Sequence, residues 1–267
     1  KILKSEFKIK ILCKGGKLKL GRFEKSGKII NGVVEPNSQV KVIKGNFFQE
    51  NIEFTGEIFN LDELKILAPI LPPSMLALAK NYGSHLQGED PPKQPEPFYK
   101  TTSSLASHLD NIIIPRDSKR VDAESELVAV IGKVAKNVEI ENVFDYILGY
   151  TCGNDVSARD WQKGDKSWWR AKSSDSFSPI GPFIETDVDP ENLQITGRIN
   201  GKEVQSCNTR EMIWSIPKTI EFITRYVTLY PGDCIFTGTS GTAGQIVSGD
   251  KVEIEIENIG VLINTCI

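Results

Sequence analysis

The sequence contains very little histidine, since only His85 and His108 occur among its 267 residues. A zinc site built from three histidines is therefore excluded, and so is a metalloprotease helix of the HExxH type. Any metal ion that this protein binds must consequently be held mainly by carboxylates, which are the ligands that hard cations prefer.

The sequence also lacks long apolar runs and an excess of basic residues. No run approaches the roughly 20 residues of a membrane span, and lysines interrupt the apolar residues from 7 to 12, so neither a membrane segment nor a secretory signal is predicted. The 32 basic and 35 acidic side chains give a net charge of −3. This balance argues against binding to nucleic acids or anionic membranes, which requires a basic face.

The cysteines fit neither a disulfide framework nor a zinc site, because they are odd in number, widely spaced and never arranged as CxxC. We therefore expect reduced, mostly buried thiols and a cytoplasmic protein. The five cysteines are Cys13, Cys152, Cys207, Cys234 and Cys266.

Short alternating segments separated by turn residues predict a β-rich α+β fold. We expect a small N-terminal β-rich domain over residues 1–70 and a larger domain over residues 71–267, with Pro72-Pro73 at the boundary. Helical periodicity is limited to Pro217–Val227 and, more briefly, Ser157–Gln162. Strands are expected over residues 7–12, 17–23, 39–43, 75–79, 112–114, 124–131, 148–152, 193–199, 203–207, 234–237, 251–256 and 261–264.

Two connections have their own sequence signatures. Asn200-Gly201 between two predicted strands indicates a type I′ hairpin. The stretch from Asn81 to Pro97 is polar, rich in proline and without apolar periodicity. Such a long loop inside a compact domain is usually functional, and we interpret it as a lid.

Glu124 and Glu126 stand two residues apart at the start of a predicted strand, so their side chains leave the same face. A bare Glu-x-Glu pair is usually an exposed polar face. Here, however, residues 127–131 are apolar at every position, which is typical of a strand buried on both faces. Two adjacent buried carboxylates need compensation, and a divalent cation would supply it.

A second polar cluster follows another predicted strand. Asp155 stands where that strand ends, and Ser157 could cap the next helix, which would explain both residues without any function. On that helix Arg159 and Gln162 share a face and could reach a ligand near Asp155. Lys172 could complement the carboxylates or orient a substrate oxygen, although a surface lysine would have the same signature.

The glycine-rich segment 237–244 follows a further predicted strand and contains Thr239 and Ser240. Its backbone N–H groups could cradle an anion, but it lacks the Gly-Lys-Ser/Thr of a P-loop and could equally be a simple turn.

The order of these motifs along the chain resembles the fumarylacetoacetate hydrolase family. The resemblance covers about residues 70–267, with a weaker similarity from about Lys19, and residues 1–16 lie outside it. The motifs that carry it are Asn81-Tyr82-x-x-His85, Glu124-x-Glu126, Gly149-Tyr150-Thr151-x-x-Asn154-Asp155-x-Ser157-Ala158-Arg159-Asp160-x-Gln162, Lys172-x-x-Asp175-x-Phe177-x-Pro179-x-Gly181-Pro182, Asn200-Gly201 and Pro231-Gly232-Asp233-x-Ile235-x-Thr237-Gly238-Thr239.

The resemblance implies the mixed β-sheet roll of that family and a homodimer. It also implies one Mg²⁺ or Mn²⁺ ion bound by Glu124, Glu126 and Asp155, and oxygen ligands suit both ions. The substrates of the family are 2-oxo acids, often with a second carbonyl at C4.

The resemblance further implies roles for individual side chains. Positions that contact substrate or metal-bound water in relatives match Arg159, Gln162, Lys172 and Thr239. In hydrolytic members a His–Glu pair in the lid activates water, and His85 matches that histidine. Many relatives have the glutamate three residues after the histidine, where this chain has Gly88, with Glu89 one residue later. We therefore predict His85, Glu89 and Lys172 as the catalytic residues.

The leading hypothesis is a metal-dependent hydrolase that cleaves a C–C bond in a 2,4-dioxo acid, such as an acylpyruvate, through a metal-stabilised enolate. The alternative is a decarboxylase, isomerase or tautomerase that acts on a 2-oxo or 2-hydroxy-dienoic acid at the same site, and the spacing of Glu89 keeps it open. A non-catalytic binder of 2-oxo acids is a second class. A serine hydrolase that uses Ser240 and His85 ranks last, because no Gly-x-Ser-x-Gly motif occurs.

Overall fold

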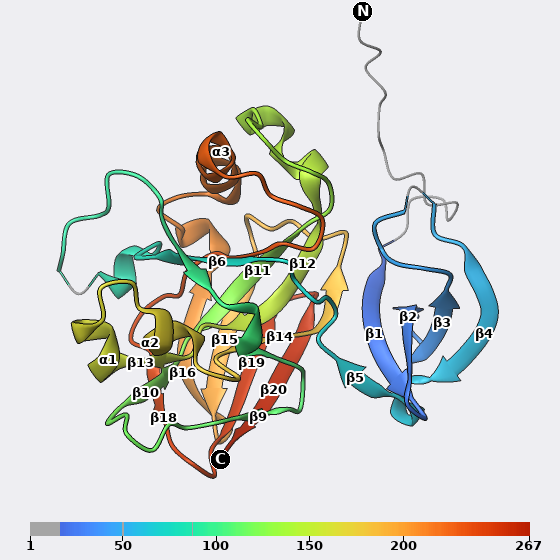
Figure 1. The fold of residues 1–267 in the computed structure, drawn as a ribbon, viewed down its shortest axis with the longest axis horizontal. Helices are drawn as coiled ribbons and strands as arrows, with labels where there is room; N and C mark the ends of the chain where they lie inside the picture. The colour runs from blue at the N-terminus through green and yellow to red at the C-terminus, as the bar shows by residue number, and fades with distance from the viewer. Residues whose placement is uncertain (1–16, 50, 87) are drawn as a thin grey trace, which may run out of the picture.

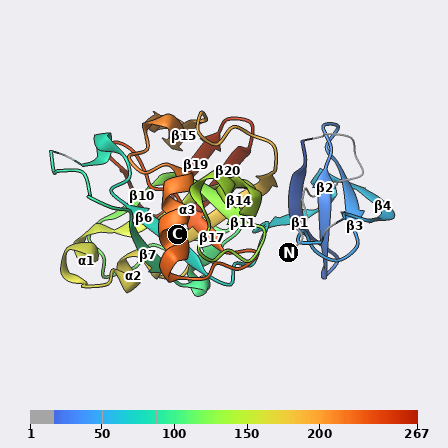
Figure 2. The ribbon, with the colours of Figure 1, turned by 90° about the horizontal axis from the view of Figure 1, so that it is seen from above.

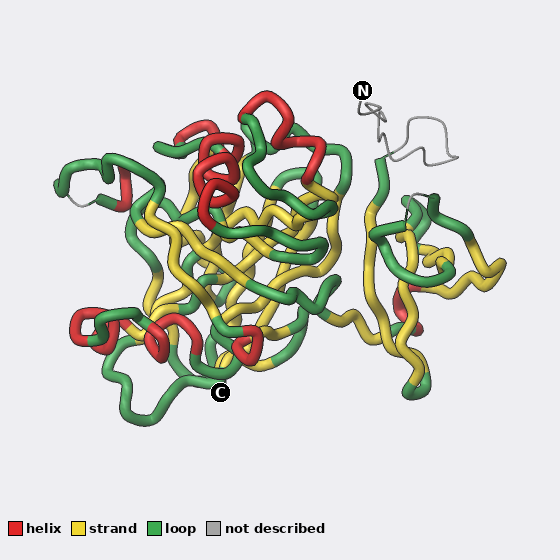
Figure 3. The backbone as a smooth tube through the Cα atoms, turned by 45° about the horizontal axis from the view of Figure 1, so that its top comes forward, coloured by secondary structure: helices red, strands yellow, loops and turns green. Residues whose placement is uncertain are grey.

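The computed structural model describes residues 17–49, 51–86 and 88–267, so the strand expected over residues 7–12 lies outside the described residues. Strands dominate the described chain, and short helices lie at its periphery (Figure 3). The predicted β-rich α+β class is therefore confirmed. The helices are α1 (Arg159–Gly164), α2 (Trp169–Ser173) and α3 (Ile216–Tyr226), with 3-10 turns η1 (Leu61–Glu63), η2 (Gly83–His85), η3 (Thr102–Ser104), η4 (Ile140–Tyr146) and η5 (Thr209–Glu211).

A large mixed sheet of twelve strands forms the centre of the described structure. Its main path runs β4-β3-β2-β1-β14-β12-β11-β17-β6-β7, while β5 pairs with β1 and β8 with β14. The β17–β6 and β14–β8 pairs are parallel, and the other pairs are antiparallel. Its strands are β1 (Lys19–Lys25), β2 (Lys28–Val34), β3 (Gln39–Ile43), β4 (Phe54–Asn60), β5 (Lys65–Leu67), β6 (Met75–Ala79), β7 (Glu96–Lys100), β8 (Leu105–Ala106), β11 (Ser125–Ile131), β12 (Ile147–Asn154), β14 (Ser178–Glu185) and β17 (Cys234–Phe236).

Two smaller sheets complete the larger body. Side chains alternate between the two faces of β19 in the five-stranded sheet, so Val252, Ile254 and Ile256 point to the same side. They belong to a hydrophobic core that also contains Leu127 and Cys152 of the large sheet. The two sheets therefore pack face to face, with α3 at one end and α1 and α2 at the other (Figure 1). The five-stranded sheet has the order β16 (Lys202–Asn208), β15 (Gln194–Ile199), β19 (Lys251–Ile256), β20 (Gly260–Cys266) and β9 (Asn111–Ile112); the three-stranded one has the order β13 (Ser157–Ala158), β10 (Val121–Ala123) and β18 (Gly244–Ile246).

The N-terminal strands β1 to β4 form a group beside the larger body (Figures 1 and 2). They join the large sheet where β1 pairs with β14, through the partners Lys19–Glu185 and Leu20–Ile184. Leu20 also shares a core with Ile180 and Ile184, so the N-terminal part is attached by both hydrogen bonds and apolar packing.

Several sequence expectations hold at the level of single residues. The bounds of β3, β6 and β19 are those expected, and α3 begins one residue early, at Ile216. Asn200 and Gly201 have φ angles of 52° and 76°, as a type I′ turn requires. None of the helices in the described residues has both the length and the apolar character that a membrane crossing requires.

One buried strand was not among those expected from the sequence, and one suggested helix cap does not form. The segment Ser178–Glu185 is a fully buried strand, although Pro179 and Pro182 argue against a central strand. Ser157 does not cap a helix, because α1 begins after Ala158 without a side-chain cap. Instead, Ser157 lies in β13, and its hydroxyl oxygen is 2.9 Å from both Glu124 Oε2 and the Asp155 carbonyl oxygen, which are the two acceptors for its one proton.

Candidate active site

The pairing of β11 with β12 brings the three predicted metal ligands together. Ser125 is the partner of Asn154, so Glu124 lies just before the start of β11 and Asp155 just after the end of β12. The Asp155 N–H donates to the Glu124 carbonyl at 3.0 Å, and the Glu124 N–H donates to Asn154 Oδ1 at 3.0 Å. One carboxylate oxygen from each of Glu124, Glu126 and Asp155 lies within 4.8 Å of the others, and all three residues are buried.

Two buried lysines contact this group of carboxylates. Lys172, on α2, donates to Glu124 Oε2 at 2.6 Å and also to Asp155 Oδ2. Lys100, at the end of β7, donates to Asp155 Oδ1 at 2.5 Å and also to the Lys172 carbonyl. The ammonium groups thus hold Glu124 and Asp155 in place from the side of α2 and β7.

The electrostatic environment differs among the three acids. Burial by itself raises the pKa of Glu124, but the charges of Lys172 and Arg159 outweigh it and hold this pKa well below the ordinary range. Glu126 is in the opposite position: burial, together with the charges of Asp155 and Glu124, raises the pKa of its carboxyl group. Burial also lowers the pKa of the Lys100 ammonium group. Of the two glutamates, Glu126 therefore has the greater need of an additional cation.

The donor set fits a divalent cation. Glu126 accepts one backbone hydrogen bond, from the Gly238 N–H at 2.7 Å, and its carboxylate lines the cavity together with Glu124 and Asp155. Three carboxylates that converge within a few ångströms offer the oxygen ligands that Mg²⁺ and Mn²⁺ prefer. Glu124, Glu126 and Asp155 could hold such an ion with open positions left for water or substrate.

Arg159 is held beside this group by a buried acid. Its Nε donates to Asp122 Oδ2 at 2.9 Å, its Nη1 to Gln162 Oε1 at 3.0 Å and its Nη2 to Glu124 Oε1. Burial lowers the pKa of the guanidinium group, but the charges of Glu124 and Asp122 outweigh it and raise this pKa further. Arg120 completes the network with two bonds to Asp122, at 2.9 and 3.1 Å. Arg159 thus presents a fixed positive charge at the wall of the cavity.

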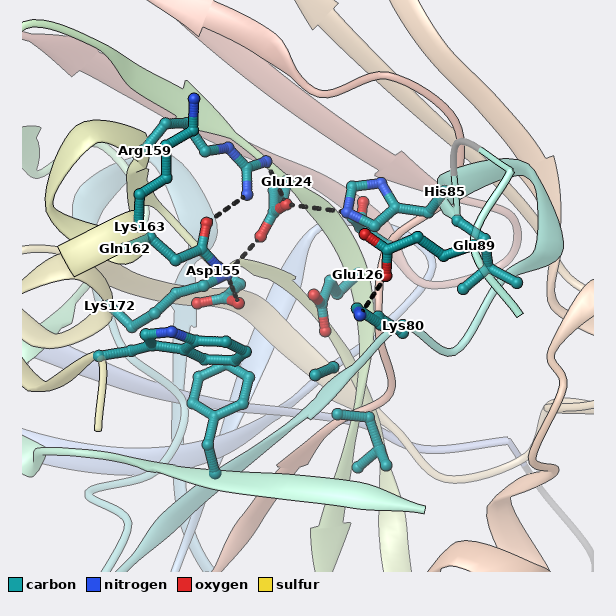
Figure 4. Close-up of a pocket in the computed structure, with 16 residues that line it drawn as sticks. Lys80, His85, Glu89, Glu124, Glu126, Asp155, Arg159, Gln162, Lys163 and Lys172 are labelled. Carbon is teal, nitrogen blue, oxygen red and sulfur yellow. Dashed lines mark hydrogen bonds and ion pairs between the residues drawn. The ribbon is translucent and has the colours of Figure 1, made fainter. Parts of the chain in front are cut away.

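His85 lies across the cavity from α1, at the end of η2 (Figure 4). Its Nδ1 is 2.7 Å from the Gly241 carbonyl, and because a carbonyl only accepts, Nδ1 must carry the proton. In the neutral ring the lone pair is then on Nε2, which is 3.7 Å from Glu124 Oε1. Gly241 also donates from its N–H to Ser84 Oγ at 3.0 Å, so the turn that bears His85 is docked on the glycine-rich segment.

Glu89 lines the same cavity, but its carboxylate forms an ion pair with Lys80. Among the contacts of the described residues, this pair is the one that Glu89 makes, rather than a hydrogen bond to His85. The predicted lid dyad is therefore not assembled in this conformation.

Thr239 also lines the cavity, and its hydroxyl is occupied by the protein itself. It donates to the Ser125 carbonyl at 3.0 Å and accepts from Gln205 Nε2 at 2.9 Å. Its neighbour Ser240 is buried, with its carbonyl bonded to Gln205 at 2.7 Å. All predicted site residues line one cavity of about 320 Å³, namely His85, Glu89, Glu124, Glu126, Asp155, Arg159, Gln162, Lys172 and Thr239.

Comparison with known proteins identifies the family. The model of the fumarylacetoacetate (FAA) hydrolase C-terminal domain matches residues 74–267, and a second model, Rv2993c-like N-terminal, matches residues 18–69. This chain belongs to the fumarylacetoacetate hydrolase family.

Relatives within the fumarylacetoacetate hydrolase family carry several names. The chain is 40% identical to oxaloacetate tautomerase Fahd2a of Rattus norvegicus, over 76% of this chain and 69% of that one. It superimposes with a TM-score of 0.88 on 5-carboxymethyl-2-hydroxymuconate delta-isomerase of Mycobacterium smegmatis, at 37% identity over 93% of this chain and 99% of that one. Maleylpyruvate hydrolase of Sphingobium sp. SYK-6, solved with manganese(II) and pyruvate, matches with a TM-score of 0.78 and 26% identity, over 93% of this chain and 98% of that one. The fumarylacetoacetate hydrolase family thus contains a tautomerase, an isomerase and a hydrolase on this fold.

Sequence reasoning missed three charged residues in or beside this cavity, Lys80, Lys100 and Asp122. Lys100 had a weak signal, because it shares with Phe98 the inward face of an alternating strand. Asp122 precedes the Glu-x-Glu pair by two residues and therefore extends the same alternation. Lys80 had no signal, since its partner Glu89 lies in a loop without periodicity.

Proposed function

We propose that this chain catalyses keto–enol proton transfer on a small 2-oxo acid, as a tautomerase or isomerase that depends on Mg²⁺ or Mn²⁺. The observation that carries the proposal is the orientation of His85, whose Nδ1 is bonded to the Gly241 carbonyl and whose Nε2 faces the carboxylates, 3.7 Å from Glu124 Oε1. Moving a proton between carbon and oxygen needs one such group near the substrate. Hydrolysis needs in addition a partner that activates water, and the carboxylate of Glu89 is engaged by Lys80.

The cavity offers complementary charges for the acid end of such a substrate. Arg159 can bind a carboxylate, while Gln162, hydrogen-bonded to it, fixes the orientation of the guanidinium group. A divalent ion held by Glu124, Glu126 and Asp155 would supply positive charge where the 2-oxo oxygen becomes negative. Lys172 keeps two of these carboxylates aligned for that purpose.

The proton transfer then follows from the position of His85. Its Nε2 removes a proton from C3 of the 2-oxo acid, the C–H electron pair forms the C2–C3 double bond, and the 2-oxo oxygen takes up the negative charge. The same ring, now protonated, returns the proton to the oxygen, which gives the enol. The Gly241 carbonyl holds the ring during both steps, through the Nδ1–H bond.

The named relatives support this class of reaction. One is called an oxaloacetate tautomerase and another a hydroxymuconate isomerase, and both names describe a shift of a proton and a double bond. Both are at least as similar to this chain as the maleylpyruvate hydrolase is.

Hydrolysis of an acylpyruvate-type 2,4-dioxo acid is the second candidate. It is favoured by the fact that His85 and Glu89 line the same side of the cavity (Figure 4). If Glu89 left Lys80, it could join His85 and activate water.

Product analysis tests the proposal. The Mg²⁺-loaded protein is incubated in D₂O with oxaloacetate and, separately, with acetylpyruvate, and NMR follows deuterium at C3 and all products. We expect accelerated exchange at C3 and enol formation that EDTA abolishes, with the carbon skeleton intact. Acetate and pyruvate from acetylpyruvate would indicate the hydrolase instead, and loss of CO₂ from oxaloacetate a decarboxylase.

A further inference from the structure

Lys80 has a fixed main chain at the rim of the cavity. It follows β6 with a φ of 54°, a left-handed conformation that is uncommon for lysine. The next residue, Asn81, anchors this conformation: its Nδ2 donates to the Thr237 carbonyl at 2.7 Å and to the Trp214 carbonyl at 3.0 Å, and its Oδ1 accepts from the Trp214 N–H at 2.8 Å. The base of the Lys80 side chain therefore has a defined position and direction.

A carboxylate already occupies the end of this side chain. Glu89 forms an ion pair with the Lys80 ammonium group, and the two side chains are 63% and 43% exposed. An ion pair so exposed contributes little stability and exchanges readily for another carboxylate. Glu89 thus shows where a carboxylate can bind at this rim.

The charge balance of the cavity leaves room for a dianion. The described residues that line it include four cationic and four anionic side chains, so their formal charges cancel. The divalent ion of the proposed function would make the sum about +2, which two substrate carboxylates would neutralise. The cations are Lys80, Arg159, Lys163 and Lys172, and the anions are Glu89, Glu124, Glu126 and Asp155.

The positions of these groups fix the direction of a bound substrate. Arg159 and Gln162 lie on one side of the three carboxylates, and Lys80 lies on the other, next to the side that carries His85 (Figure 4). With its first carboxylate at Arg159, a 2-oxo acid would place C3 toward His85 and whatever follows C3 toward Lys80.

We infer that Lys80 recognises a second carboxylate of the substrate, which displaces Glu89, and that Lys80 thereby selects 2-oxo dicarboxylic acids over monocarboxylic ones. This inference rests on the proposed function and deepens it by naming the residue that makes this selection. The distal carboxylate of the substrate would replace Glu89 as the ion-pair partner of Lys80.

Equilibrium binding of two matched ligands tests the inference without measuring turnover. Titration calorimetry on the Mn²⁺-loaded protein compares 2-oxoglutarate with 2-oxopentanoate, which has a methyl group in place of the distal carboxylate. We expect wild type to prefer 2-oxoglutarate by about tenfold, as for one charge-assisted contact. Lys80→Met should abolish the preference by weakening 2-oxoglutarate alone, and Lys80→Arg should retain most of it.

Two further variants serve as controls. Lys93→Met removes an exposed lysine from the same loop, outside the cavity, and should keep the wild-type preference. Glu89→Gln removes the competing carboxylate and should bind 2-oxoglutarate about threefold more tightly. Unchanged or weaker binding by Glu89→Gln would overturn the displacement.

The outcomes separate this inference from the proposed function. Equal binding of both ligands by wild type, or equal loss of both in Lys80→Met, would overturn the role of Lys80 while the chemistry at His85 stands. The same contrast should appear in turnover. Lys80→Met should raise KM for oxaloacetate about tenfold and leave its kcat largely unchanged. The kinetics with acetylpyruvate, which has no distal carboxylate, should also be largely unchanged. If wild type neither binds these acids nor exchanges their C3 protons, the proposed function itself fails.

Discussion

Two sets of ion pairs involve carboxylates of the same cavity and differ in their exposure. Around Asp155, the side chains of Lys100 and Lys172 are 0% and 4% exposed, whereas at the rim those of Lys80 and Glu89 are 43% and 63% exposed. In the buried set each partner depends on the other, because an unpaired charge there would lack both water and a counterion. In the exposed set water can replace either partner. The buried pairs therefore fix the geometry of the site, and the exposed pair is free to exchange.

The largest effect is expected from Glu126, which alone among the three carboxylates of the cavity has no lysine or arginine in hydrogen-bonding contact. Glu126→Gln keeps the shape of the side chain and the acceptor for the Gly238 N–H but removes a charge. We expect Mn²⁺ binding, measured by calorimetry, to weaken at least 100-fold and turnover to fall about 1,000-fold. Unchanged Mn²⁺ affinity would contradict the assignment of Glu126 as a ligand.

His85→Gln should produce the next largest change. Glutamine can still donate to the Gly241 carbonyl but cannot take up a proton, so kcat should fall about 100- to 10,000-fold. KM and Mn²⁺ affinity should stay within about threefold of wild type. A parallel loss of Mn²⁺ binding would mean that His85 holds the site together rather than moving protons.

The contributions of a buried and an exposed ion pair to stability can be compared directly by making the same substitution in each, Lys100→Met and Lys80→Met. Removal of Lys100 leaves Asp155 with less compensation, and we expect a loss of about 3 kcal/mol in the free energy of unfolding in EDTA. Lys80→Met should change it by less than about 0.5 kcal/mol. Urea denaturation followed by circular dichroism measures both, and added Mn²⁺ should restore part of the loss in Lys100→Met. Similar losses at both positions would refute the distinction between fixed and exchangeable pairs.

The smallest effect is expected from replacing Glu185, a buried carboxylate outside the cavity, and it concerns the stability of the fold. The Glu185 side chain is 0% exposed, with Lys17 Nζ 3.9 Å from its Oε2 and a hydrogen bond from the Thr186 N–H to its Oε1 at 3.1 Å. Burial raises the pKa of Glu185 above its ordinary value of 4.5. A carboxyl group with a raised pKa stabilises the fold at low pH, and this stabilisation is lost as the pH rises through the folded-state pKa.

Glu185→Gln should therefore raise the melting temperature at pH 8 by roughly 2 °C, or about 1 kcal/mol, and have almost no effect at pH 4. Thermal melts across this range measure the difference, with Glu203→Gln, an exposed glutamate, as the control. A gain at pH 4 that disappears at pH 8 would have the wrong sign.

Much of the fold follows from local pattern. Alternation in Lys251–Ile256 and the apolar run in Met75–Ala79 define strands with the observed bounds, because side chains alternate between faces or are buried on both. Ser178–Glu185 could not be predicted in this way, since two prolines remove N–H donors from a strand that pairs on both sides. Its place depends on partners distant in the sequence.

The candidate site also contains residues that local sequence pattern predicts and residues whose role depends on distant partners. The family motif and the buried surroundings of Glu124 and Glu126 pointed to the carboxylate group, and the structure brings Asp155 to it. The alternation in β7 was only a weak signal for Lys100, because the role of this residue depends on Asp155, 55 residues away. The ion pair between Glu89 and Lys80 could not be predicted, since ion pairs at an exposed rim leave no periodic signal in the sequence.

The pairing of β11 with β12 has a consequence for how the protein matures. Glu124 and Asp155 meet only when Ser125 opposes Asn154, and a slip by one residue would turn the alternating side chains to opposite faces. The observed register requires glycine at position 153, since a Cβ there would lie 2.4 Å from Val128 Cγ2 and 2.7 Å from the Phe236 ring. Binding of a dication would thus require the correct register of β11 against β12, and molecules with a misaligned pair would lack the assembled group of carboxylates.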